Sequence, residues 1–468
     1  MDFVGPQPFA GRVLLLGLGC IGKGVLPLLL RHLQPDPARV LIVSPESPAL
    51  QHAASHGFKT LAARITRRNL HATLGARLRP GDLLLNLSVG VDSVPLIALA
   101  RQRGALYVDT AQEPWADEAP MPPALRTNHA RRRAALALGR QPGGPTAVLC
   151  HGANPGLVSH FVKQGLLKMA EETGAFRHIP PPKSPQAWAR WAQALGVRTI
   201  HIAERDTQWS ATHRLPGEFV NTWSVRGFIE EALQPAEVGW GTHERRLPRD
   251  GHRHRGGSAP GIWLSQPGAA TRALTWTPHI GPTLGFVITH MEALTIADWL
   301  TVGSPRRPEW RPTVHYAYRP CDDAVLSLHE MAGAGWRVPS LQRHLGDDVV
   351  GGTDELGVLM GGPPTGALWM GSQLTAAEAR AVAPGNTATT LQVAAGVMAA
   401  AVWAAQHPNR GLLEPEDLPH EEILALARPY LGKLAAVRTD WTPLQARHTA
   451  LGRAPEPDDP WQFANVRV

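Results

Sequence analysis

Several acidic side chains stand in segments that are otherwise apolar or turn-like, where a charge needs a partner. Trp223 stands among small polar residues in the segment VNTWSV, unlike a ring that only fills a core. Carboxylates form charge-assisted hydrogen bonds with amines, and an indole face attracts cations. Together these residues favour a site for an ammonium ligand, although each carboxylate alone also fits a helix cap, a salt bridge or a solvated surface. The acidic residues are Glu113, Glu204, Glu230, Glu231, Glu237, Asp354 and Glu355.

A glycine-rich loop follows the first apolar run of the chain. Residues 12–16 read RVLLL, which suits a buried parallel strand, and residues 17–22 read GLGCIG before a helical pattern. Strand, glycine loop and helix in this order indicate a dinucleotide site. Gly17 permits the tight turn, Gly19 lets the backbone approach a pyrophosphate, and Gly22 allows close packing of helix on strand.

The residue after the second predicted strand, 39–43, bears on the choice of dinucleotide. A carboxylate for the adenosine ribose normally stands there. Here Ser44 takes that place, and Glu46 follows two residues later. No arginine follows immediately to hold a 2′-phosphate, so the segment favours NAD but leaves NADP open.

Strand-like runs at 82–87 and 105–109, with a helical segment at 94–103 between them, predict an open, doubly wound sheet of the Rossmann type. Ligands of such sheets lie beyond the carboxyl ends of the strands, which brings Ser88, Val89, Thr110 and Glu113 near the nicotinamide. The residues that we expect to bind the cofactor are Gly17, Gly19, Cys20, Ile21, Gly22, Ser44, Asn86, Ser88, Val89, Asp109, Thr110, Gly152, Ala153, Asn154 and Pro155.

The rest of the chain predicts a second, α+β domain for the substrate and for dimerisation, so that the whole is an α/β protein. The fourth strand-like run, 146–150, leads into HGANPG, whose turn is either an ordinary turn or part of the site. Segment 245–258 is rich in Arg, His and Gly; we expect an exposed loop and no metal site, because its histidines lack ligand spacing. Expected elements are a helix at 157–175, a Pro-rich loop at 179–185, strands at 199–203, 273–276 and 285–290, and a buried helix at 387–405.

The predicted organisation has three parts. Residues 1–155 form the NAD-binding domain, residues 156–375 the substrate and dimerisation domain, and residues 376–468 a C-terminal segment that in part returns to the first domain. The aromatic tail at 459–463 is expected to dock on the protein.

Composition narrows the class of protein. The chain has 468 residues, 43% hydrophobic and 18% charged, with no membrane span or signal peptide, so we expect a cytoplasmic protein without a membrane partner. Cys20, Cys150 and Cys321 are odd in number and lack paired spacing, which argues against a disulfide framework and a zinc knuckle. The formal net charge is +7, but the arginines are scattered, and we expect no nucleic-acid partner. A cationic substrate therefore needs a locally acidic pocket.

In blocks along nearly its whole length the chain resembles the bacterial homospermidine synthases. The blocks are GLGCIGKGVLPLL, NLSV, ALYVDTAQEPW, HGANPG, HIAERDTQ, VNTWSVRGFIEEALQPAEVGWGTHE, ITHMEALTIADWL, PTVHYAYRPCDDAVLSLHEM, DELGVL, TDWTPL and DPWQF. The resemblance implies a fold similar to the saccharopine reductases and a homodimer. It also implies that NAD oxidises putrescine to an imine, that a second diamine displaces ammonia, and that the same cofactor reduces the new imine to homospermidine. Spermidine or 1,3-diaminopropane are further possible substrates.

The resemblance also implies roles for single residues. Trp223 would hold an ammonium group by cation–π contact, Glu204 would act at the reacting amine as a base or carboxylate partner, and Glu231 would anchor the diamine. Glu113, Asn154, His290 and Asp354 match further pocket positions; with Glu204, we expect Asn154 and His290, a candidate proton shuttle, to be catalytic.

One position departs from the family pattern. An acidic residue is expected directly after NLSV, where this chain has Gly90, with Asp92 two residues along. Either Asp92 substitutes from the same loop, or one amine contact is missing.

Two other functions remain open at this point. A saccharopine or carboxynorspermidine dehydrogenase would share the fold, but it would need convergent Arg or Lys for a carboxylate-bearing substrate. A non-catalytic NAD-binding protein would leave the second-domain carboxylates facing solvent.

Overall fold

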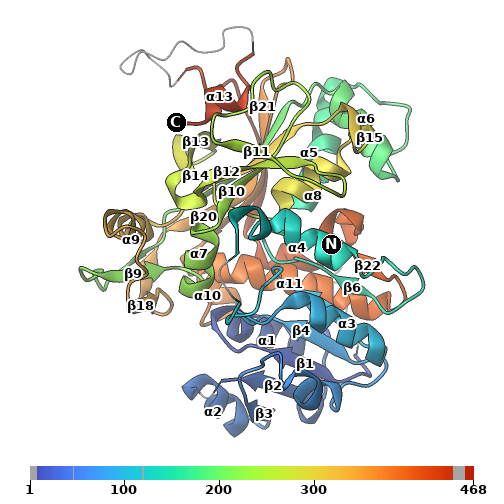
Figure 1. Ribbon diagram of the computed structural model, residues 1–468, viewed down its shortest axis with the longest axis vertical. Coiled ribbons are helices and arrows are strands. Elements are labelled where there is room, and N and C mark those ends of the chain that lie inside the picture. The colour runs from blue at the N-terminus through green and yellow to red at the C-terminus, as the bar shows by residue number, and fades with distance from the viewer. Residues whose placement is uncertain (1–7, 46, 119–120, 446–458) are drawn as a thin grey trace.

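The computed structural model describes residues 8–45, 47–118, 121–445 and 459–468, which form two large sheets (Figure 1). The first sheet has the order β22-β6-β5-β4-β1-β2-β3, and all its pairs are parallel. Apart from β22, this is the Rossmann order, and the expected doubly wound domain is confirmed. Its strands are β1 (Val13–Leu16), β2 (Val40–Ser44), β3 (Lys59–Ala62), β4 (Leu83–Asn86), β5 (Leu106–Asp109), β6 (Ala147–Val148) and β22 (Leu412–Leu413).

Helix α11 (Ala388–Gln406) joins the C-terminal part of the chain to the first sheet. It packs against α1 (Cys20–His32) and β5, and it also contacts α12 (His420–Ala427). By length and composition α11 could cross a membrane, but 89% of its apolar window is buried inside the protein. The other helices beside the first sheet are α2 (Pro48–Ser55), α3 (Ser93–Arg103) and α4 (Asn128–Leu136).

The second sheet lies above the first in Figure 1 and runs β11-β12-β10-β17-β7-β20-β21-β23, with β14 beside β17 and β13 beside β14. These strands are β7 (Thr199–Asp206), β10 (Pro235–Gly239), β11 (Gly251–Arg253), β12 (Gly261–Pro267), β13 (Arg272–Thr277), β14 (Gly281–Phe286), β17 (Thr313–Arg319), β20 (Thr353–Gly361), β21 (Ala367–Thr375) and β23 (Lys433–Thr439). The helices are α5 (Leu157–Thr173), α6 (Pro185–Ala194), α7 (Val225–Ala232), α8 (Glu292–Trp299), α9 (Asp322–Gly333), α10 (Ala376–Val382) and α13 (Phe463–Val466).

Three small sheets complete the fold. They pair β8 (Trp209–Ser210) with β19 (Val349–Gly351), β9 (Glu218–Asn221) with β18 (Leu341–His344), and β15 (Val302–Ser304) with β16 (Arg307–Trp310).

Two local expectations are wrong. Segment 245–258 is not an exposed loop throughout, because residues 251–253 form β11 and His254 is buried against Glu237. The strand expected at 285–290 ends at Phe286, because its last residues leave the sheet and carry His290 towards the interior. Where the domains divide stays a prediction.

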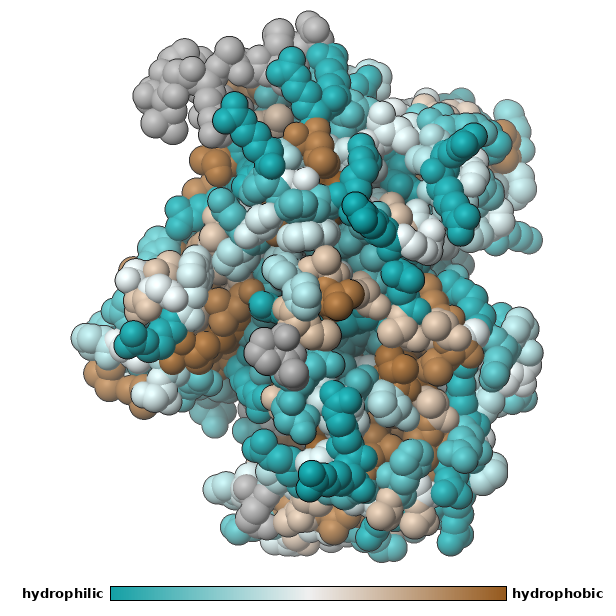
Figure 2. Space-filling model, in the orientation of Figure 1, coloured by the Kyte–Doolittle hydropathy of each residue, from teal (hydrophilic) through white to brown (hydrophobic). Residues whose placement is uncertain are grey.

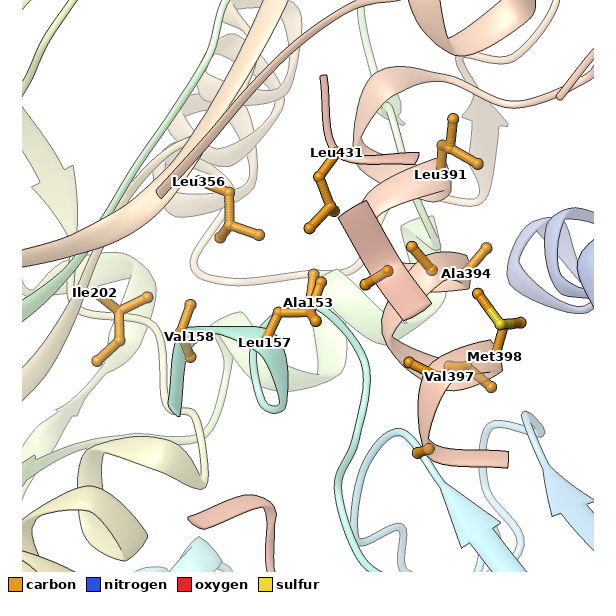
Figure 3. Packing of buried hydrophobic residues seen from close by; sticks show 14 of the residues in the cluster. Ala153, Leu157, Val158, Ile202, Leu356, Leu391, Ala394, Val397, Met398 and Leu431 are labelled. Carbon is orange, nitrogen blue, oxygen red and sulfur yellow. The ribbon is translucent and has the colours of Figure 1, made fainter. Parts of the chain in front are cut away.

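The buried core is continuous from one sheet to the other. Figure 3 shows Ala153 of the loop before α5 and Leu157 at the start of α5 near Ile202 and Leu356 of the second sheet and Ala394 of α11. Because close-packed interiors resist displacement, this core holds the loop at 151–156 in a defined position between the sheets.

Candidate active site

A cavity of about 410 Å³ lies between the two sheets, at the carboxyl ends of β1, β2, β4 and β5. We call it the main cavity. From the residues expected to bind the cofactor it brings together Gly17, Gly19, Cys20, Ile21, Ser44, Ser88, Val89, Thr110, Gly152, Ala153, Asn154 and Pro155. From the residues expected to bind or act on an amine it brings together Glu113, Glu204, Trp223, Glu231 and His290.

Three residues expected to bind the cofactor lie behind the cavity wall. Gly22 packs on Gly17, where an added Cβ would collide with the Gly17 carbonyl oxygen. The Asn86 side chain accepts a hydrogen bond from the Ser88 hydroxyl at 2.6 Å. Asp109 accepts one from the Cys150 backbone at 2.6 Å. These three residues therefore contact the loops that line the cavity and do not line the cavity themselves.

The glycine loop leaves the start of α1 open. Gly17 has φ +96°, a conformation that favours glycine, and nothing lies within 4 Å of a Cβ built on Gly19. Gly19 is the N-cap of α1, and no side chain caps the first N–H groups of this helix. A helix start with free N–H groups and an uncrowded backbone binds phosphate, so these residues fit a dinucleotide pyrophosphate.

The adenosine end of the main cavity contains both polar groups and a cation. The Ser44 hydroxyl accepts a hydrogen bond of 3.4 Å from the Leu18 backbone, and Ser44 lines the cavity. Arg64, which follows β3, lines the same wall. Arg64 comes beside Ser44 because β3 pairs with β2, a pairing that no local sequence pattern indicates. Glu46 lies outside the described residues.

Glu204 points from β7 into the main cavity and is 2% exposed. Its carboxylate accepts hydrogen bonds from the Asn154 amide at 2.8 Å and from the Tyr316 hydroxyl. Burial raises the pKa of Glu204 to about 7, and the two hydrogen bonds offset part of that effect. No guanidinium or lysine of the described chain forms an ion pair with this carboxylate.

Glu113 forms a second acidic point in the same cavity. It accepts a hydrogen bond of 3.1 Å from the Gly90 backbone. Burial, together with the negative charge of Glu230, raises the pKa of Glu113 to about 7. Both acids therefore sit near the midpoint of their ionisation at neutral pH, and an arriving cation would favour their charged forms.

Trp223 stands between β9 and α7 and is half-buried. Its indole N–H donates to the Tyr318 hydroxyl at 3.2 Å, and its ring packs on Phe228 with centroids 5.6 Å apart. These contacts fix the orientation of the ring while the residue still lines the main cavity.

His290 is held between two carboxylates. Its Nε2 lies 3.0 Å from Glu231, and its Nδ1 lies 3.2 Å from Glu292. Burial lowers the pKa of His290, but the charges of Glu292 and Glu231 outweigh burial and raise it to about 10. At neutral pH His290 is thus an imidazolium, which can donate a proton but has no free nitrogen to accept one.

Asp354 and Asp92 do not line the cavity. Asp354 is buried on β20 beside Asp206 of β7, and it accepts a hydrogen bond of 2.6 Å from Thr389, which does line the cavity. Burial and the charges of Glu204 and Asp206 raise the pKa of Asp354 well above its usual range. Asp92 caps α3 through the Val94 backbone at 3.0 Å, so it does not replace an acid at Gly90.

The other carboxylates singled out in the sequence have different surroundings. Glu237 is fully buried and accepts hydrogen bonds from the backbones of Asn128 and His129 at the start of α4, which is a structural role. Glu355 accepts from the His279 backbone at 3.0 Å. Glu230 pairs with Arg226 at 2.8 Å.

An adjoining cavity of about 340 Å³ shares a wall with the main cavity. The shared residues are Gly90, Ala111, Glu113, Trp115, Ala116, Pro155, Arg226, Gly227, Glu231 and His290. A chain-like ligand whose reacting end lies by Glu204 can therefore extend past Glu231 into a second space.

Sequence reasoning missed Tyr316, Thr389 and Glu292. Tyr316 of β17 lies directly across from Ile202, two residues before Glu204 on β7, and its ring packs against His290 with centroids 4.4 Å apart. The alternating pattern VHYAY could have indicated that both tyrosines of that strand face one side. Nothing in the sequence links Thr389 or Glu292 to the site.

The comparisons with known proteins agree along the whole chain. Residues 13–148 match the saccharopine dehydrogenase NADP binding domain, and residues 152–439 match the saccharopine dehydrogenase C-terminal domain. A homospermidine synthase of Blastochloris viridis is 45% identical over 98% of this chain and 97% of its own length. One of Mesorhizobium japonicum is 42% identical over 98% and 96%.

A solved structure is similarly close. The homospermidine synthase of Legionella pneumophila, in complex with NAD, superposes with a TM-score of 0.93 at 41% identity, covering 99% of each chain. With relatives this similar over nearly its full length, and with the glycine loop, the acids and the indole gathered in one cavity, the chain belongs to the homospermidine synthase family of the saccharopine dehydrogenase-like proteins.

Proposed function

We propose that the chain is an NAD-dependent homospermidine synthase, which oxidises putrescine to an imine, transfers the aminobutyl group to a second diamine with release of ammonia, and reduces the new imine. The observation that carries this proposal is a cavity that contains the glycine loop together with the carboxylates of Glu113, Glu204 and Glu231 and the indole of Trp223. Diamines are flexible chains with cationic ends, and this combination suits them. Family membership supports it further.

NAD would be held by the glycine loop and by the residues that line the main cavity beside it. The pyrophosphate would lie on the open start of α1 at Gly19, and the nicotinamide would lie towards Asn154 and Glu204. When bound, this group accepts a hydride from the amine-bearing carbon of the donor and returns it later, so that no external oxidant is consumed.

Glu204 would take the proton that the donor ammonium must lose before a hydride can leave. A carboxylate with a pKa of about 7 is half ionised at neutral pH, which suits a general base. Asn154 and Tyr316 fix its orientation from two sides. His290, protonated between Glu231 and Glu292, would serve as a proton donor to the departing amine or to the new secondary amine.

Substrate charge would be balanced by acids rather than by solvent. Glu113 and Glu231 line both cavities, so they can hold ammonium groups on either side of the reacting carbon. Trp223 would contact an ammonium with its ring face. Saccharopine-type substrates carry carboxylates at the reacting end, where this cavity has Glu113, Glu204 and Glu231 instead.

The decisive experiment is incubation of the purified protein with putrescine and a catalytic amount of NAD⁺. We expect homospermidine and ammonia in equal amounts, many turnovers per NAD⁺, and no accumulation of reduced cofactor. Mass spectrometry and an ammonia assay measure the products. Net reduction of NAD⁺ in proportion to putrescine consumed, without homospermidine, would instead make the protein a simple amine dehydrogenase.

We also propose a cytoplasmic homodimer. Large apolar side chains are exposed on the lobe formed by β8, β9, β18, β19 and α9, where Figure 2 shows brown residues on the left of the molecule. A second copy of the chain would cover this apolar face, because such patches on a monomer normally mark a protein contact. The residues of the apolar face are Trp209, Leu215, Leu326, Val338, Leu341 and Val350.

A further inference from the structure

The adjoining cavity differs from the main cavity in its charge. Beside the acids Glu113, Glu118, Glu230 and Glu231 it is lined by three arginines, Arg126, Arg131 and Arg226, whereas the main cavity is lined by Arg64 and Arg226. A space meant only for a second ammonium group would have no use for guanidinium groups, because like charges repel in a partly buried site.

Two of these guanidinium groups form no salt bridge among the described residues, whereas Arg226 pairs with Glu230 at 2.8 Å. The charge of Arg131 still acts on Glu113 and lowers the pKa of that acid. Arg126 donates to the Leu233 carbonyl at 3.2 Å, and Arg131 donates to the Gln112 carbonyl at 3.1 Å, and neither forms an ion pair there. Both side chains are half-buried on the segment 126–131 that forms one wall of the adjoining cavity. Half-buried guanidinium groups bonded only to carbonyl oxygens retain donors that suit a carboxylate.

Arg226 lines both cavities and lies next to Gly90, the position at which this chain departs from the family pattern. Gly90 has φ +76°, and a Cβ there would lie 2.8 Å from the Ala116 Cβ and 3.1 Å from Nη2 of Arg226. There is thus no room for the acidic side chain expected at this position, and a guanidinium group lies next to it. The junction therefore carries both charges, because the Glu113 carboxylate accepts a hydrogen bond from the Gly90 backbone and Arg226 pairs with Glu230.

We propose that the adjoining cavity lets the enzyme use, as acceptor, an amine whose far end carries a carboxylate. The chemical class comprises ω-amino acids and diamino acids. Their amino group would attack at the reacting carbon while their carboxylate lies among Arg126, Arg131 and Arg226. This inference rests on the proposed function, because the donor half of the reaction is unchanged.

The reaction balances without a further reagent. Putrescine loses a hydride from carbon and a proton from nitrogen to give an imine. The acceptor nitrogen forms a bond to the imine carbon, the original carbon–nitrogen bond breaks, and ammonia leaves. The hydride then returns to carbon and a proton adds to nitrogen, so that putrescine and 4-aminobutanoate give N-(4-aminobutyl)-4-aminobutanoate and ammonia.

The test uses the full-length protein with NAD⁺, putrescine deuterated at both amine-bearing carbons, and unlabelled 4-aminobutanoate or ornithine in excess. 4-Aminobutanoate has the length of putrescine with a carboxylate in place of one ammonium group. We expect the mixed product, with all four deuterium atoms retained, beside homospermidine. Homospermidine without any mixed product overturns the inference and leaves the proposed function intact, whereas the absence of both overturns the proposed function.

Variants connect the activity to the arginines. We expect Arg226→Gln and Arg131→Gln each to lower the ratio of mixed product to homospermidine about tenfold, because a charge-assisted contact is lost. Lys168→Gln is the matched control: this helix residue pairs with Glu171 at 2.8 Å and lines neither cavity, so both rates should stay unchanged. An unchanged ratio in both arginine variants would overturn the assignment of the carboxylate to this cavity.

Discussion

At the scale of single residues, the site combines two acids that are about half-ionised at neutral pH with one imidazolium. Glu113 and Glu204 each have a pKa of about 7, and His290 has one of about 10. An empty cavity in which both acids were fully ionised and unpaired would be costly, since buried charges without partners are strongly disfavoured. The raised pKa values reduce that cost, and a bound cation restores the charge.

Trp223→Ala should remove the cation–π contact without disturbing the cofactor. A desolvated cation–π contact is worth about 2 kcal/mol, so we expect kcat/KM for putrescine to fall about 30-fold while NAD⁺ binds as before. Steady-state kinetics and a fluorescence titration of the cofactor measure both. Trp223→Phe should retain part of the activity, and Trp263→Ala, outside both cavities, is the control. Full activity of the alanine variant would contradict a role for the ring.

Glu204→Gln should abolish proton removal while keeping the hydrogen-bond partners Asn154 and Tyr316 in place. Loss of a general base typically costs about 100-fold or more in rate, and we expect a fall of this size in kcat. Rapid-mixing measurement of the first hydride transfer gives the value. A normal rate would remove Glu204 from the catalytic residues.

The catalytic efficiency should also rise with pH in the range where Glu113 and Glu204 ionise. Glu113 and Glu204 are protonated below a pH of about 7 and ionised above it, and only the ionised forms attract an ammonium group or accept a proton. We therefore expect kcat/KM to rise between about pH 6 and pH 8. Glu113→Gln should make the rise shallower.

The raised pKa values also mean that these two acids lower the stability of the empty protein as pH rises from about 4.5 towards 7.

At the scale of elements, strand register explains which acids meet. β7 carries Glu204 and Asp206 on one face because they are two residues apart, and β20 places Asp354 opposite Asp206. Asp354 therefore reaches the site only through Thr389 of α11. Helix α4 is connected to the second sheet by an acid, because Glu237 of β10 accepts hydrogen bonds from the backbones at its start.

Glu237→Gln tests that connection between the two halves of the molecule. Burial opposes ionisation of Glu237, but hydrogen bonds from His254, His129 and Asn128 outweigh it and lower its pKa, so the carboxylate is charged in the folded protein. The variant loses a charge-assisted bond in a buried position, and we expect the free energy of unfolding to fall by about 2 kcal/mol. Urea denaturation measures it. Glu171→Gln, on an exposed position of α5, should leave the stability unchanged.

Part of this arrangement could be predicted from the sequence and part could not. The glycine loop, the apolar strands after it and the cofactor residues near Ser88 and Thr110 follow local patterns, because parallel strands and their loops obey regular rules. Arg64, Tyr316 and Thr389 reach the site through strand order and helix packing, which depend on contacts between distant segments. Asp92 and Glu237 carry the same charge as the site acids, and only their hydrogen bonds to helix starts distinguish them.

At the scale of the whole molecule, the site lies between two sheets, and each contributes a different part of the chemistry. The first sheet brings the glycine loop and Glu113; the second brings Glu204 and, through the segments beside it, Trp223, Glu231 and His290. Most cofactor residues therefore come from the first half and most amine residues from the second, so the site is complete only where the two halves meet. The apolar face around Leu341 lies on a separate lobe of the second half.

The oligomeric state is open to a direct test. We expect the protein to elute with twice the mass of its 50.5 kDa chain in light-scattering chromatography. Leu326→Asp combined with Leu341→Asp should shift it to a monomer, because burying two carboxylates in an apolar contact is unfavourable. Ile179→Asp, an exposed apolar residue outside the apolar face, is the control. A double variant that remains dimeric would show that the dimer contact lies outside the apolar face. A monomeric parent protein would contradict the proposed dimer.

The position of β22 bears on how the chain is made. This strand, Leu412–Leu413, extends the first sheet beside β6, and α11 packs on α1 at the opposite end of the sequence. During synthesis, the N-terminal sheet must therefore wait for more than 250 later residues before its last strand and its covering helix leave the ribosome. A chain that ends before that point would contain a nucleotide-binding domain with an unpaired edge strand and an exposed apolar surface. We expect chaperones to bind such a fragment and proteases to degrade it.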